Sequence, residues 1–286
     1  MTSRTASLVT DTDFQAHEDG TLDVHITDSW FHSFGLLGGY VSGIALRASA
    51  LAHGQGEALR PASIAVHYLA KPEVGPVRGR TEVVRNGRTA AYVRADLLQE
   101  RTTLTATTLF HRVADGPTIG VTGAGVPGCL GPRESTPLPV ACRPYPDGTT
   151  SLYGRALELR IPEDDLAAWD VRPDTTLDTW MRFREGGWDA DSALRASAMC
   201  ALVDLAMLPA ARRGFTEAWV VPSLDLHVQF HGIDHPIADE GEWFLVRSHA
   251  PEAAGGTVSG TAEVRTEGGR LLATAMQQMT ALPPVR

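Results

Sequence analysis

The chain has 286 residues, a length that suits two domains of about 130 residues better than one small domain. It carries 25 Lys and Arg residues against 34 Asp and Glu residues, a net charge of -9. This balance argues against a nucleic-acid-binding protein, because neutralising phosphates requires clustered positive charge. We therefore expect no nucleic-acid partner.

Cysteine usage and the N-terminus indicate where the protein works. Cys129, Cys142 and Cys200 are odd in number and follow no CxxC spacing, so neither a disulfide framework nor a zinc site is expected. The first twenty residues contain no apolar core of a signal peptide, and no run of about 18 apolar residues occurs anywhere. We expect a cytoplasmic protein without metal or cofactor that neither spans a membrane nor is exported by a standard signal.

Apolar residues recur every second residue in some segments, as in strands, and about every 3.6 residues in others, as in helices. The order of these segments occurs twice along the chain. In the first half this pattern predicts a strand at 21–30, a helix at 38–54, and strands at 61–72, 77–87, 88–100 and 102–112. In the second half it predicts a strand at 152–161, a helix at 191–214, and strands at 219–232, 242–251, 257–269 and 270–282. The pattern therefore predicts two similar α+β repeats, 1–113 and 151–286, joined by a Gly- and Pro-rich linker at 114–150.

One helix cannot cover all the apolar surface of a strongly twisted antiparallel sheet. Duplication lets two such sheets pair edge to edge into a larger one. The predicted architecture is thus a pair of tandem repeats, each a long central helix wrapped by an antiparallel sheet.

Three polar residues of the second half are candidates for chemistry. Asp204 lies in the middle of a helix that is apolar on nearly every face, where a carboxylate must be hydrogen-bonded or have a shifted pKa. Gln277 falls on the core-facing side of the last strand. Ser223 follows Pro222 where the chain returns from that helix, so its hydroxyl could reach the carboxylate from an end-of-strand position. The structural alternatives are an acid tied to a loop amide or an arginine, a glutamine satisfied by backbone, and an ordinary turn serine.

The first half provides an internal comparison for these three positions. At the offset that aligns Ser63 with Ser223, the counterpart of Asp204 is Ile44, and the slightly larger offset of the last strand pairs Gln277 with Phe110. An acid and an amide that both occur in only one repeat are what one functional site per chain predicts.

The motifs of both halves resemble the acyl-CoA thioesterase II (TesB-like) family of double hotdog proteins over nearly the whole chain outside the linker. The first half carries GGYVSGIAL and VVRNGRTAAYVRADLLQ, and the second carries VDLAMLP, VPSLDLHVQFH and LLATAMQQ. The resemblance implies the double hotdog fold. It also implies that Asp204, Ser223 and Gln277 orient an attacking water, with Ser in place of the family's usual Thr. Gln278 and Met279 depart from the acid and glycine that often follow the family's Gln.

The function implied by the resemblance is hydrolysis of an acyl-CoA to a carboxylic acid and CoA by direct attack of water, without a covalent intermediate. Gly38 and Gly39, at the opening of the first helix, are the expected substrate-binding residues, since amides at a helix N-terminus can stabilise charge on the thioester oxygen. The expected partners are acyl-CoA or an acylated carrier protein, and a second copy of the chain in a homodimer or larger oligomer.

Two other functions are compatible with the same fold. The chain could be a hotdog module that binds acyl-CoA or an acyl carrier protein without catalysis, although the presence of all three site residues argues against this. A hotdog hydratase or dehydratase would require an Asp/His pair near the helix start, which the sequence lacks there.

Overall fold

The structure is a computed structural model that describes residues 6–32, 35–54, 59–112, 129–137, 156–162, 175–213, 215, 220–233, 237 and 242–283. The first half contains α1 (Leu8–Asp11), β1 (Phe14–Ala16), β2 (Thr21–Ile26), a 3-10 turn (Asp28–Trp30), β3 (Phe31–His32), β4 (Gly35–Leu36), α2 (Gly38–His53), β5 (Leu59–Tyr68), β6 (Gly75–Asn86), β7 (Ala90–Leu98) and β8 (Thr102–Arg112). The second contains β9 (Thr136–Pro137), β10 (Leu157–Ile161), β11 (Thr176–Phe183), α5 (Ser192–Arg213), β12 (Asp225–Phe230), β13 (Phe244–Ala254), β14 (Thr257–Thr266) and β15 (Leu271–Thr280).

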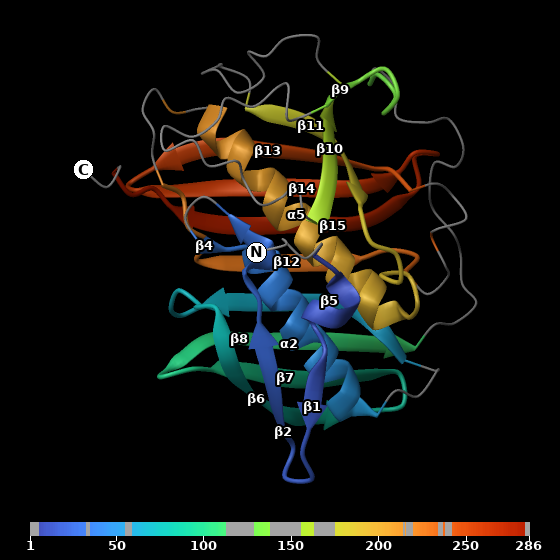
Figure 1. Cartoon of the computed structure of the whole chain (residues 1–286), viewed down its shortest axis with the longest axis vertical. Helices are drawn as coiled ribbons and strands as arrows, with labels where there is room; N and C mark the ends of the chain where they lie inside the picture. The colour runs from blue at the N-terminus through green and yellow to red at the C-terminus, as the bar shows by residue number, and fades with distance from the viewer. Residues whose placement is uncertain are drawn as a thin grey trace, which may run out of the picture.

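One antiparallel sheet runs through both halves. Its 13 strands follow the order β1-β2-β6-β7-β8-β5-β12-β15-β14-β13-β11-β10-β9. Apart from the added end strand β9, the strands of the second half occupy the same places, counted from its end of the sheet, as the corresponding strands of the first half. The halves meet where β5 pairs with β12, and the sheet curves around α2 in one half and α5 in the other (Figure 1). The predicted double hotdog α+β fold, with two sheets joined edge to edge, is confirmed.

The symmetry of the strand order corrects one detail of the predicted repeat. The strand predicted at 152–161 was matched to the strand at 21–30, but β11 (Thr176–Phe183) occupies the place equivalent to β2, directly before the helix and beside β13. The strand β10 corresponds instead to β1 at the sheet margin. The pattern at 176–183 was missed because four of its eight positions are polar or charged, three of them on the outer face.

Most of the predicted linker 114–150 lies outside the described residues, but 129–137 is described. It ends in β9, which pairs with β10, and the carbonyl oxygen of Leu130 accepts a 2.8 Å hydrogen bond from the Trp180 indole N–H. This part of the segment therefore packs on the second half. The division into repeats and linker otherwise stays a prediction.

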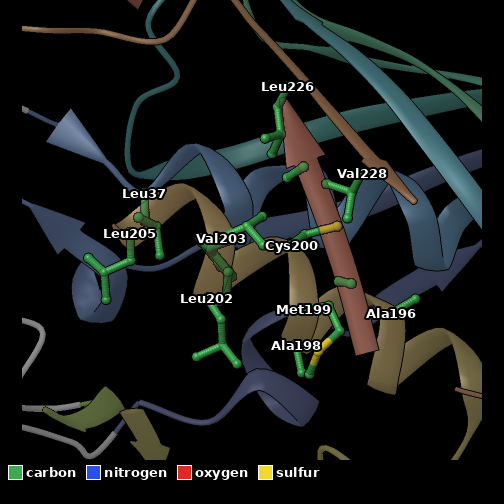
Figure 2. Packing of buried hydrophobic residues seen from close by; sticks show 14 of the residues in the cluster. Leu37, Ala196, Ala198, Met199, Cys200, Leu202, Val203, Leu205, Leu226 and Val228 are labelled. Atoms are coloured by element: carbon green, nitrogen blue, oxygen red, sulfur yellow. The ribbon is translucent and has the colours of Figure 1, made fainter. Parts of the chain in front are cut away.

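The two long helices of the described chain are enclosed by the sheet. Seven of the eight residues from Ala196 to Val203 are apolar, and each of the eight is 0% exposed, so this part of α5 is buried on every side. Figure 2 shows several of these side chains in the core. Leu226 and Val228 of β12 also belong to this core. A helix that is apolar all round belongs inside a core, which explains its sequence.

Glycines allow α2 and α5 to cross closely. A Cβ at Gly39 would overlap the carbonyl oxygen of Cys200, and one at Gly43 would lie 3.0 Å from the Cβ of Ser197. The Ser197 hydroxyl donates a 3.1 Å hydrogen bond to the Gly43 carbonyl at the same crossing. This close approach brings the N-terminus of α2 against the middle of α5, where Asp204 lies.

The helix bounds also correct the internal comparison. Counted from the first residue of each helix, Gly38 and Ser192, the counterpart of Asp204 is Ala50 rather than Ile44. Ser63 lies inside β5 opposite Gln229, whereas Ser223 lies two residues before β12. The conclusion drawn from the comparison is unchanged, because Ala50 is also apolar.

Candidate active site

The three polar candidates of the second half meet at one carboxylate. Gln277 Nε2 donates a 2.6 Å hydrogen bond to Asp204 Oδ1, and the Ser223 hydroxyl donates one of 3.3 Å to the same oxygen. Gln277 Nε2 also donates to Ser223 Oγ over 2.7 Å. An amide nitrogen has two hydrogens, so it can make both bonds at once. The predicted trio is therefore brought together.

Each of the three side chains is positioned by a different element. Asp204 is 7% exposed on α5, and Gln277 is 3% exposed on the inner face of β15. Ser223 stands two residues before β12 in an isolated bridge to Met279, the end-of-strand position that its predicted role requires. Gln278 lies on the outer, exposed face, so the structure places Gln277 and not Gln278 at the carboxylate.

The second carboxylate oxygen is held by the first half of the chain. The N–H of Gly39, in the first turn of α2, donates a 2.8 Å hydrogen bond to Asp204 Oδ2. The N-cap residue of α2, Leu37, makes no side-chain cap, so Asp204 takes the place of a local capping residue. The site thus requires both repeats.

Opposing effects act on the Asp204 carboxyl. Burial raises its pKa above the ordinary value of 3.8, because the charged form loses its hydration. Hydrogen bonds from Gly39, Gln277, Ser223 and Gly38 lower the pKa in turn, and burial is the larger effect. The result is a carboxylate that accepts protons more readily than an exposed one.

Gln277 Oε1 is buried and has no hydrogen-bond partner among the described residues. A buried acceptor without a partner costs roughly 1–3 kcal/mol, which makes it a strong site for a polar ligand atom. It belongs to the same amide whose nitrogen contacts Asp204 and Ser223, so a donor bound there would also lie near the carboxylate.

Two residues near the carboxylate were not predicted from the sequence. The hydroxyl of Tyr68, the last residue of β5, is 2.8 Å from Ser42 Oγ on α2. A Cβ at Gly38 would lie 2.9 Å from the Tyr68 ring, so the ring packs directly on the start of the helix. The sequence offers little signal for either, because Ser42 reads as a small helical residue and Tyr68 as a strand end.

The described residues contain neither a metal-binding cluster nor a membrane-spanning helix. No group of three or more His, Cys, Asp or Glu side chains is arranged to hold a metal ion in the part of the chain that the structure describes. Within the same residues, no helix is both long and apolar enough to cross a membrane.

Similar structures share this fold over their full length. A conserved protein with a hot dog fold from Alicyclobacillus acidocaldarius matches with a TM-score of 0.78 and 20% identity, covering 98% of this chain and 100% of that one. An acyl-CoA thioesterase II from Mycobacterium marinum matches with a TM-score of 0.74 and 21% identity, covering 97% and 99%. The tesB protein of Mycobacterium avium subspecies paratuberculosis matches with a TM-score of 0.74 and 18% identity, covering 96% and 98%.

Sequence profiles identify the family. The acyl-CoA thioesterase N-terminal domain matches residues 26–111, and the acyl-CoA thioesterase C-terminal domain matches residues 132–281. No curated protein matches the chain. The profile matches cover both repeats and all three residues of the carboxylate cluster. The chain therefore belongs to the acyl-CoA thioesterase family.

Proposed function

We propose that the protein hydrolyses an acyl-CoA to a free carboxylic acid and CoA, with Asp204 as general base. Water oxygen bonds to the thioester carbonyl carbon while Asp204 takes a proton from that water. The carbon–sulfur bond then breaks, and the proton passes to the leaving thiolate. The observation that carries the proposal is the buried cluster in which Ser223 and Gln277 both donate to Asp204 Oδ1.

The geometry supports direct attack by water. A water between Asp204 and Gln277 would donate one hydrogen to the carboxylate and the other to the unpartnered Oε1 of Gln277. No acyl-enzyme intermediate is then needed. Ser223 donates its own hydrogen to Asp204, a bond that keeps the hydroxyl turned toward the base.

Charge on the thioester oxygen would develop at the N-terminus of α2, whose helix dipole is positive there. Gly38 and Gly39 would contribute here through the positive end of the helix dipole and not through the Gly39 N–H, whose single hydrogen is donated to Asp204. The Gly39 N–H already donates to Asp204, so this amide also orients the base. The same helix end would then serve both the carboxylate and the substrate.

Two alternatives make different predictions. A hydratase or dehydratase would need a histidine beside the acid. The described residues that hydrogen-bond to Asp204 are instead Gly38, Gly39, Ser223 and Gln277. A binding module without catalysis would retain a ligand pocket but have no reason to keep a base with a raised pKa.

The proposal is tested by following thiol release from acyl-CoAs of short, long and aromatic acyl groups, with acylated carrier protein in parallel. We expect release above the buffer rate with at least one acyl-CoA. In parallel, calorimetry measures binding of a thioether analogue of the acyl-CoA, which cannot be hydrolysed. Binding of the analogue without release from any thioester would favour the binding module.

A further inference from the structure

The peptide group between Gly38 and Gly39 is hydrogen-bonded on both sides. Its N–H, on Gly39, donates to Asp204 Oδ2 over 2.8 Å. Its carbonyl oxygen, on Gly38, accepts a 2.9 Å hydrogen bond from the Ser42 hydroxyl. Because one amide carries both bonds, a donor at the oxygen polarises the group and strengthens donation by the N–H.

The chain of hydrogen bonds continues to Tyr68. Its hydroxyl lies 2.8 Å from Ser42 Oγ. A serine hydroxyl has a single hydrogen, and a carbonyl oxygen can only accept, so the hydrogen of Ser42 is committed to Gly38. Tyr68 must therefore be the donor to Ser42. All the donors point the same way, from β5 through α2 to the carboxylate on α5.

The surroundings favour a strong effect along this chain. Ser42 is 0% exposed, and hydrogen bonds in a low-dielectric interior reinforce one another. Burial and the nearby Asp204 charge raise the pKa of Tyr68 well above 10, so its hydroxyl keeps the proton that it donates.

Among the residues that the structure describes, the titratable groups found beside Asp204 are Cys200 and Tyr68, and neither carries a positive charge. Cys200 lies one turn earlier on α5, and burial raises the pKa of its thiol, so it stays neutral. Tyr68 approaches from β5, and Asp225 lies near that tyrosine. The ion pairs found between described residues do not include Asp204. Hydrogen bonds therefore offset its charge, and the strength of each one matters.

We propose that Tyr68 and Ser42 are positioning residues that orient and stabilise the ionised Asp204 through the Gly38–Gly39 peptide. The effect on hydrolysis rests on the function proposed above. The effect on the carboxylate itself does not, and it is measurable without substrate.

The test measures the pKa of Asp204 by carbon NMR in protein labelled at the Asp carboxyl carbon, with the resonance assigned from its loss in Asp204→Asn. We expect the pKa to rise by about 0.3–0.7 in Tyr68→Phe, which keeps the ring that packs on Gly38, and by more in Ser42→Ala. The matched control is Ser49→Ala, since Ser49 is buried on the same helix and donates the equivalent bond to Ala45. This control should leave the pKa unchanged.

Kinetics provide the second measurement. The acid limb of kcat/KM should move to higher pH by the same amount in Tyr68→Phe and Ser42→Ala, with KM changed less than twofold, and Ser42→Thr should restore it. If the pKa of Asp204 in both Tyr68→Phe and Ser42→Ala equals the pKa in the Ser49→Ala control, the inference is overturned. If Ser42→Ala does not fold, Tyr68→Phe decides alone. A wild-type protein inactive on every thioester would contradict the proposed function, while the NMR titration would still decide the role of this chain.

Discussion

At the scale of single residues, the site is a balance around one buried carboxylate. Burial disfavours the charged form of Asp204, and four donors favour it. Glutamine and serine are suited to this task, because they donate to the carboxylate without adding a charge that would suppress its basicity. The sequence predicted Asp204, Ser223 and Gln277 from an acid in an apolar helix, strand parity and family motifs.

The raised pKa of Asp204 predicts opposite pH dependences for stability and activity. Its folded pKa lies above the unfolded value near 3.8, so the folded state binds more protons between the two values. The stability from this group is complete below 3.8 and is lost as pH rises through the folded pKa. The rate should instead increase over that range, because the base must be ionised. Urea unfolding across pH should show this slope in the wild type and a flatter one in Asp204→Asn.

The register of the last strand predicts different effects for two adjacent glutamines. Gln277→Met removes the donor to Asp204 and Ser223 while keeping the side-chain volume, so kcat should fall by about 10- to 100-fold. Gln278→Met changes an outward-facing side chain and serves as the matched control, with activity within about twofold of wild type. A larger loss of activity in Gln278→Met than in Gln277→Met would contradict the assignment of Gln277 to the site.

Tyr68 and Ser42 could not be predicted from the sequence, for a physical reason. Their importance depends on a crossing between β5, α2 and α5 that brings together residues far apart in the chain. Periodicity reports which face of an element is buried, but not which atoms meet across elements.

At the scale of elements, the crossing of α2 and α5 constructs the site. It places a helix N-terminus from the first half against a carboxylate from the second. Helices α2 and α5 and ten of the strands follow the apolar pattern closely enough to be predicted, whereas the four-residue helix α1 was not predicted. The short strands β1, β3, β4 and β9, each of two or three residues, have too few positions to show a period. The strand β11 was missed because its outer face is polar.

The crossing makes Gly39 a sensitive position. In Gly39→Ala the new Cβ meets the backbone carbonyl of Cys200, which cannot move aside as a flexible side chain could. We expect unfolding free energy to fall by about 3 kcal/mol, together with loss of activity. Gly186→Ala is the control, because a Cβ there has nothing within 4 Å and should be neutral. Urea denaturation compares the two, and equal stabilities would show that the helices do not approach this closely.

At the scale of the whole molecule, two repeats have become unequal. Both contribute a helix and half of the sheet, but Asp204 and Gln277 occur in the second, and Gly39 comes from the first. Joining the sheets through β5 and β12 fixes the position of the helices relative to each other. This arrangement explains why the fold was predictable from the repeat, whereas the site needed the contact between repeats.

The outer face of the joined sheet predicts self-association. Met276 of β15 is 65% exposed there, and its paired neighbours on β12 and β14 are His227 and Thr261 rather than Lys or Arg. Such a surface suits a second copy of the chain. Light scattering should give twice the 30.7 kDa of one chain or more, and Met276→Glu should lower the mass. The chain mass alone at all concentrations would contradict this expectation.

The most direct test of the central claim is kcat/KM of Asp204→Asn against the wild type on the best acyl-CoA found. The substitution keeps the shape of the side chain and removes its basicity. We predict a loss of about 100- to 10,000-fold in a protein that remains folded by circular dichroism and still binds the thioether analogue. Turnover equal to that of the wild type would contradict the assignment of Asp204 as the base, even if the protein proves to be a thioesterase.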